Sequence, residues 1–331
     1  MSVVRMTMAK AINAGLQRVL AEDPKTLLMG EDIGKLGGVY RITEGLQAEF
    51  GDDRVIDSPL AESGIIGTSI GLALRGYRPI AEIQFDGFVF PGFNQITTQL
   101  AKLHMRSEGN LTVPVTIRIP YGGGIGSIEH HSESPEALFA HTAGLRIMTP
   151  STPHDAYWMI QEAVSSNDPV IFFEPKRRYW MKGDVDTERR AAPAATAHVV
   201  RQGSDATVLA WGPLVPVALA AAQAAEEDGR DVEVVDLRSL SPIDFDTVVA
   251  SVKRTGRLVI AHEAPTFGGL GGEIAARVAE RAFYSLEAPV LRVGGFHMPY
   301  PPSKVEGNYL PDIDRILEAL DRSFDHAEAN S

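Results

Sequence analysis

The chain has 331 residues, an apolar share of 44%, no cysteine and a formal net charge of −12. The length predicts about two domains, and the missing cysteines exclude disulfides, thiolate metal sites and a cysteine nucleophile. The negative charge argues against nucleic acid or an anionic membrane as a partner. Residues 1–20 have an amphipathic helical rhythm rather than a signal pattern, and no apolar run approaches the ~20 residues of a membrane span, so we expect a cytoplasmic location.

Short apolar runs alternate with helical patterns in the first half of the chain. The apolar runs predict strands at 26–29, 79–83, 114–119, 145–148 and 169–174. Segments with helical periodicity lie between them, near 62–75, 89–106 and 153–166. This alternation is typical of an α/β fold with a mostly parallel sheet.

A polar segment that becomes rich in alanine and proline, MKGDVDTERRAAPAATA, interrupts the alternation at 181–197. It has no buried rhythm and is typical of a linker between domains. The alternation then restarts, with strands expected at 206–211, 231–236, 257–261 and 289–293, and helices near 213–227, 243–253, 271–284 and 311–323. We predict one domain over 1–185, a linker over 186–200 and a smaller α/β domain over 201–331.

Glu62 opens a small and apolar helical pattern within the segment DSPLAESGIIGTSIG (57–71). Isoleucines and a serine follow it at three- and four-residue spacing. Because burial disfavours the charged form of a carboxyl, a glutamate in such surroundings can donate and take back a proton near neutral pH. The alternative is an ordinary first-turn glutamate that the helix dipole stabilises.

Two further segments place polar and aromatic side chains where a ligand could bind. Gln84 and Phe88 follow an expected strand, and ligands of open α/β sheets gather at the carboxyl ends of strands. His130 and His131 follow a glycine-rich stretch over 122–126, which we interpret as a loop able to move or to admit a large partner. On an extended segment adjacent side chains point to opposite sides, so only one histidine should face the site.

Motifs of several other enzyme classes are missing from the sequence. It contains no HExxH pair, no aspartate-rich calcium loop, no GxSxG nucleophile elbow and no Rossmann fingerprint between a strand and a helix. The glycines of GGLGGE (268–273) precede an expected helix and could bind phosphate. A tight turn packed against a neighbouring domain or subunit is the favoured interpretation of that motif.

Seven segments resemble, in the same order, the beta subunits of the thiamine-diphosphate-dependent 2-oxo acid dehydrogenases. They are MGEDIGKLGGVYRITEGL (29–46), DSPLAESGIIGTSIG (57–71), AEIQFDGFVFPGFNQI (81–96), HHSESPEALFAHTAGLRIMTPSTPHDA (130–156), DPVIFFEPKRRY (168–179), VDLRSLSPID (235–244) and AHEAPTFGGLGGEI (261–274). The resemblance covers roughly residues 5–325. Within the family, the chain looks most like the branched-chain 2-oxo acid dehydrogenase beta subunit.

The resemblance implies an N-terminal pyrimidine-binding domain and a C-terminal domain, both of the transketolase type and with mostly parallel sheets. It implies that Glu62 hydrogen-bonds the pyrimidine ring of thiamine diphosphate and activates the cofactor. It places Gln84 at the cofactor and stacks Phe88 on the aminopyrimidine ring. His131 would orient the substrate or supply a proton. Potassium, which the family also binds, would map to Val113, Val115, Thr116, Ala163, Ser166 and Asp168.

The family's magnesium motif, GDG followed some way on by Asn, is absent from the sequence. The resemblance therefore implies an α2β2 heterotetramer in which an alpha subunit binds the diphosphate through magnesium. The tetramer would decarboxylate a branched-chain 2-oxo acid such as 3-methyl-2-oxobutanoate, in branched-chain amino acid catabolism, and pass the acyl group to lipoyl on an acyltransferase component. The alternatives are a pyruvate or acetoin dehydrogenase beta subunit and a non-catalytic assembly scaffold.

Overall fold

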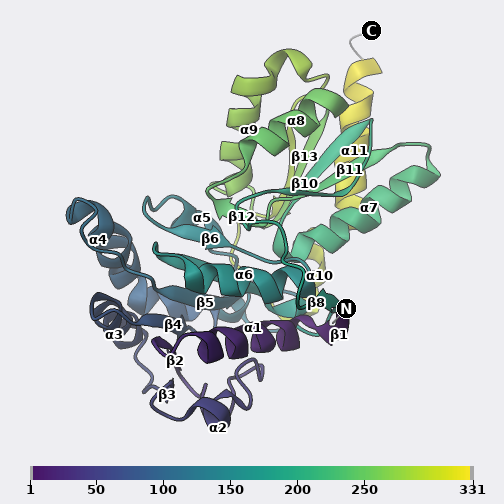
Figure 1. The fold of residues 1–331 in the computed structure, drawn as a ribbon. Helices are drawn as coiled ribbons and strands as arrows, with labels where there is room; N and C mark the ends of the chain where they lie inside the picture. Colours follow the sequence, from purple (N-terminus) through teal and green to yellow (C-terminus); the bar gives the residue numbers. More distant parts are fainter. Residues whose placement is uncertain (1–2, 329–331) are drawn as a thin grey trace.

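The computed structural model describes residues 3–328, which form two α/β units in succession along the chain (Figure 1). The first unit has the strands β1 (Val3–Thr7), β2 (Thr26–Gly30), β3 (Val55–Asp57), β4 (Arg78–Glu82), β5 (Thr116–Tyr121), β6 (Arg146–Met148), β7 (Val170–Pro175) and β8 (Lys182–Asp186). Its helices are α1 (Met8–Glu22), α2 (Leu46–Phe50), α3 (Glu62–Leu74), α4 (Ala101–Arg106), α5 (Glu136–Ala140) and α6 (Pro153–Ser165).

The second unit begins after β8. Its strands are β9 (His198–Arg201), β10 (Ala206–Ala210), β11 (Val232–Asp236), β12 (Ser239–Ser241), β13 (Leu258–Pro265) and β14 (Leu291–Gly295). Its helices are α7 (Val215–Glu227), α8 (Phe245–Thr255), α9 (Leu270–Ala282), α10 (Glu306–Tyr309) and α11 (Ile313–Glu328). Within residues 3–328, no helix combines the length and the apolar character that crossing a membrane requires.

Each unit is built on one large sheet. The first sheet has the order β12-β6-β7-β5-β4-β2-β3, and all its neighbours pair in parallel except β12 with β6. The second has the order β14-β13-β10-β11-β9, in which β9 runs antiparallel to β11. Buried residues of α1 and α6 share a core with β2, β4 and β7. The expected α/β fold with two domains and mostly parallel sheets is confirmed.

The two units are joined by a strand that crosses between them. β12 follows β11 of the second unit but pairs with β6 at the edge of the first sheet. Beside it, Arg238 is buried and donates hydrogen bonds to Asp155 of α6 at 2.8 Å and to the carbonyls of Pro193 and Thr196 at 3.0 and 3.1 Å. The segment between the units is thus held by side-chain contacts, and the domain boundaries given above stay a prediction.

The segment near 89–106 is helical as expected, but it is not one regular α-helix. The chain forms instead a 3-10 turn η1 (Asp86–Gly92), a π-helical stretch (Gln95–Leu100) and then α4. Pro91 lies inside η1, and proline lacks the backbone N–H that a regular helix needs. Such departures from α-helical geometry are frequent at functional sites. Here η1 begins at Asp86, shortly after β4 ends at Glu82.

Candidate active site

Three polar residues, of which only Gln84 was predicted for the site, lie near the carboxyl ends of parallel strands in the first sheet. β2 pairs in parallel with β4, and β5 and β7 continue the same sheet beyond β4. Glu31 follows the last residue of β2, Gln84 comes just after β4, and Lys176 follows β7. Because the carboxyl ends of parallel strands meet at one edge of a sheet, these segments form the edge at which ligands of α/β folds gather.

Glu62 is the first residue of α3 and is buried, with 8% of its surface exposed. The start of α3 packs closely against η1. A Cβ atom placed on Gly92 of η1 would lie 3.2 Å from the Glu62 carbonyl oxygen and 3.3 Å from a side-chain carbon of Ile66. Glycine at position 92 therefore lets the turn that contains Phe88 lie directly against the helix that begins with Glu62.

A second acid, Glu31, lies beside Glu62 and was missed from the sequence. Glu31 is buried, and among residues 3–328 its Oε1 has no hydrogen-bond partner. Burial raises the pKa of Glu31, and the neighbouring Glu62 carboxylate raises it further. The side-chain amide of Gln84 donates to the Glu31 carbonyl and to Oδ2 of Asp32, both at 3.4 Å. The structure thus brings Gln84, Glu31 and Glu62 close together. In the sequence, Glu31 and Asp32 directly follow an apolar strand, and this acidic pair could have identified Glu31 as a site residue.

The two histidines lie on a 3-10 turn, η3 (Glu129–His131), rather than on an extended segment. The expectation that they point to opposite sides is wrong, because their rings are 4.6 Å apart and both lie near Phe88, His131 at 5.1 Å and His130 at 6.0 Å. His131 also meets Phe85 at 4.3 Å. Burial lowers the pKa of His131, and the charges of His130 and Lys176 lower it further. Both effects favour the neutral imidazole, which is the form able to accept a proton.

The glycine loop after β5 is held by carboxylates of the second unit. The N–H of Gly124 donates to Glu306 Oε1 at 2.7 Å, and the N–H of Gly126 donates to Glu306 Oε2 at 3.0 Å. The N–H of Gly123 donates to Glu263 of β13. A Cβ atom on Gly123 would collide with the Tyr300 hydroxyl at 1.8 Å. These contacts tie the loop to the second unit, whereas the sequence suggested a loop free to move.

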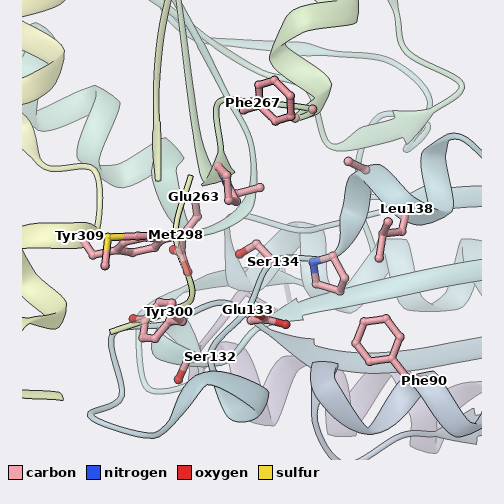
Figure 2. Close-up of a pocket in the computed structure, with 16 residues that line it drawn as sticks. Phe90, Ser132, Glu133, Ser134, Leu138, Glu263, Phe267, Met298, Tyr300 and Tyr309 are labelled. Carbon is pink, nitrogen blue, oxygen red and sulfur yellow. The ribbon is translucent and has the colours of Figure 1, made fainter. Parts of the chain in front are cut away.

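A cavity of about 190 Å³ lies between the two units, next to the histidine turn (Figure 2). Glu133 and Ser134, which follow that turn, line it from the first unit, and Glu263, Phe267 and Met298 line it from the second. The predicted residues Glu62, Gln84, Phe88 and His131 are not part of its wall. The cavity therefore adjoins the site at the strand ends without containing it.

The six residues predicted for potassium lie on two segments that do meet. The N–H of Val113 donates to the Asn167 carbonyl at 3.3 Å, and the N–H of Val170 donates to the Val115 carbonyl at 2.9 Å. The guanidinium of Arg78 already binds the carbonyls of Val164 and Ser166 at 3.0 Å each. The positive charge of Arg78 disfavours binding of a potassium ion to the same carbonyls. The potassium site stays a prediction. Among the described residues, no three His, Asp or Glu side chains gather as metal ligands.

Comparisons with known proteins match both units of the chain. A family model described as "Transketolase, pyrimidine binding domain" matches residues 4–181, and one described as "Transketolase, C-terminal domain" matches residues 195–316. A "Pyruvate dehydrogenase E1 component subunit beta" of Leifsonia xyli is 65% identical over 97% of this chain and 96% of its own length. A "3-methyl-2-oxobutanoate dehydrogenase subunit beta" of Mycobacterium tuberculosis is 52% identical over 96% and 91%.

The fold is similar to that of a solved structure. A "Split gene transketolase, inactive beta4 tetramer" aligns with a TM-score of 0.81 over 97% of this chain and 99% of that one, at 23% sequence identity. At this identity the likeness supports the fold alone.

Proposed function

This chain belongs to the E1 beta subunits of the 2-oxo acid dehydrogenases, which are built from transketolase-type domains, and from that premise we propose that it supplies the pyrimidine-binding half of a thiamine diphosphate site. The observation that supports the proposal is the packing at the strand ends of the first unit: Gln84 donates to the carbonyl of Glu31 next to Glu62, and η1, which contains Phe88, lies against the start of α3, where Glu62 is buried. An acid, an amide and an aromatic ring on one edge suit the polar rim and flat faces of an aminopyrimidine.

The polar atoms at this edge fit such a ligand. Oε1 of Glu31 and Nδ1 of His131 are buried and have no partner among residues 3–328, so a bound heterocycle could satisfy groups that are costly to leave alone. Bound thiamine diphosphate would supply the nucleophilic carbon and the electron sink that decarboxylation of a 2-oxo acid requires. Glu62 would share a proton with the pyrimidine ring, and Phe88 would offer its face to the same ring. His131 would accept or return a proton at the substrate.

Removing each histidine in turn tests their assignment. We expect His131→Ala to slow acyl transfer to a lipoyl acceptor more than His130→Ala does, because His131 contacts both Phe85 and Phe88, whereas His130 has a ring contact with only the second of these phenylalanines. The rate of reductive acylation of an isolated lipoyl domain by the reconstituted tetramer measures this. If the rate of acyl transfer falls equally in the two variants, or falls only in His130→Ala, the role proposed for His131 is wrong.

The site is half of what the cofactor needs, since the sequence lacks the family's diphosphate-and-magnesium motif. We propose an α2β2 heterotetramer whose alpha subunit binds the diphosphate through magnesium, and an acyltransferase component that accepts the acyl group on lipoyl. The chain alone should then bind thiamine diphosphate weakly or not at all. Calorimetric titration with and without magnesium checks this, and tight magnesium-dependent binding to the chain alone would contradict the divided site.

For the acyl chain we propose a branched-chain 2-oxo acid. Exposed apolar side chains lie next to the site residues in sequence, Leu60 two residues before Glu62 and Ile128 at the start of the histidine turn, and apolar side chains suit a branched alkyl group. Pyruvate is the second candidate, and the 65% identity to a subunit named for pyruvate dehydrogenase favours it. One methylene in an apolar pocket is worth about 10–200-fold in discrimination.

The ratio of kcat/KM for 3-methyl-2-oxobutanoate to that for pyruvate distinguishes the two substrates. A ratio above one supports the branched-chain proposal, and a ratio well below one transfers the assignment to pyruvate. If the chain assembles with the alpha subunit and the acyltransferase component but the complex turns over neither substrate, a non-catalytic scaffold would be favoured.

A further inference from the structure

Asp86 and Lys176 form an ion pair inside the first unit, next to residues of the candidate site. Both side chains are almost fully buried, at 0% and 1% exposure, and Nζ of Lys176 donates to Oδ1 of Asp86. Asp86 is the first residue of η1, whereas Lys176 follows strand β7. The pair therefore attaches an irregular turn to a rigid strand.

The second oxygen of Asp86 attaches the histidine turn to the same point. Oδ2 of Asp86 accepts the N–H of Glu133, two residues after His131, at 2.8 Å. Gly87, next to Asp86, allows the two turns to touch, since a Cβ atom there would lie 2.4 Å from the His130 carbonyl oxygen. One carboxylate thus binds both η3 and β7 to the turn that contains Phe88.

Contacts of Lys176 and Phe85 also connect the ion pair with Phe88 and His131. Nζ of Lys176 lies 5.8 Å from the ring centre of Phe85, and Phe85 packs against Phe88 at 5.5 Å and against His131 at 4.3 Å. Burial raises the pKa of Asp86 to about 6 and lowers that of Lys176, and each shift is opposed by the partner's charge. A buried pair of this kind is costly to break, because the remaining charge is left without a partner.

We propose that Asp86 is a positioning residue that holds Phe88 and His131 in register through Lys176 and the Glu133 N–H. The inference rests on the proposed function in one respect only, namely that Phe88 and His131 meet cofactor and substrate. Asp86 itself need not touch either. A displacement of about 1 Å in groups that do can cost on the order of 10²-fold in rate.

Two double variants separate the hydrogen bond from Glu133 N–H to Asp86, here called the tether, from the ion pair between Asp86 and Lys176. Asp86→Asn with Lys176→Met removes both charges but keeps a side-chain oxygen that can accept the Glu133 N–H. Asp86→Ala with Lys176→Met removes that oxygen as well. Neither leaves an unpaired buried charge, so both should fold. Val208→Ala, in the buried core of the second unit, is a control that lowers stability without touching η1.

The reconstituted tetramer without cofactor gives the first readout, amide hydrogen exchange at Glu133. Exchange should speed up in the alanine double variant and stay close to wild type in the asparagine double variant and in Val208→Ala. With cofactor, kcat of the alanine double variant should fall about 10²-fold below that of the asparagine double variant, with little change in KM.

Unchanged exchange at Glu133 in the alanine double variant would overturn the tether, whatever the activity. Faster exchange with equal kcat in the two double variants would overturn the positioning role. A wild-type tetramer without activity would instead count against the proposed function, and the exchange comparison would still decide whether Asp86 fixes the histidine turn.

Discussion

Replacing Glu62 with Gln should reduce 2-oxo acid decarboxylation by the reconstituted tetramer by about 10²–10⁴-fold, the usual range for a well-placed acid–base group. The amide has nearly the same shape as the carboxyl, so α3 should still pack against η1. It cannot share a proton with the pyrimidine ring. Release of carbon dioxide in single-turnover and steady-state assays measures the loss.

Thermal unfolding of the Glu62→Gln tetramer controls for its structure, and Glu22→Gln, an exposed glutamate on α1, controls for the loss of a charge. Both variants should unfold close to the wild-type temperature. Near-normal turnover in Glu62→Gln would remove the role assigned to this residue.

Arg118→Met should lower the free energy of unfolding by about 3–5 kcal/mol, the usual cost of leaving buried charges without their partner. Arg118 lies at the centre of the first sheet with no exposed surface, and it binds Glu82 of β4 and both carboxylate oxygens of Glu174 of β7, at 2.6 and 3.0 Å for the latter. Tyr179 also donates to Glu174 at 2.6 Å. Denaturant unfolding of the chain measures the difference.

A matched variant separates charge from packing in this cluster. Adding Glu82→Gln and Glu174→Gln to Arg118→Met removes the unpaired carboxylates and should restore part of the stability. Because burial already raises the pKa of Glu82, and protonation neutralises buried carboxyls, the deficit of Arg118→Met should also shrink as the pH is lowered. If Arg118→Met lowers the free energy of unfolding by less than about 1 kcal/mol, which is the contribution of a surface ion pair, then the charges of this cluster are not buried away from water.

The regular parts of the fold could be predicted because local patterns decide them. The apolar runs at 26–29 and 79–83 became β2 and β4, since buried parallel strands read as continuous apolar segments. The segment after β4 could not, because its amphipathic residues fit a helix while Pro91 and contacts with α3 impose η1 and a π-helical stretch. β12 is three residues long, and only pairing with β6 makes it a strand.

The site could be predicted in the parts that the family motifs contain. Glu62, Gln84 and Phe88 came from such motifs, and their roles at the cofactor stay a prediction. Asp86 and Lys176 lie within quoted motifs too, yet their pairing spans 90 positions of the chain. Both residues are buried only because the folded sheet packs around them, and the residues next to them in the sequence do not indicate this burial.

We propose that this chain holds one half of a catalytic site. The most direct test of this proposal is 2-oxo acid decarboxylation, with thiamine diphosphate and magnesium present, by the chain alone, by its alpha subunit alone and by the two together. We expect turnover in the mixture and none in either subunit alone. Turnover by this chain alone, or an inactive mixture in which the two subunits form a stable tetramer, would contradict a catalytic site divided between the two subunits.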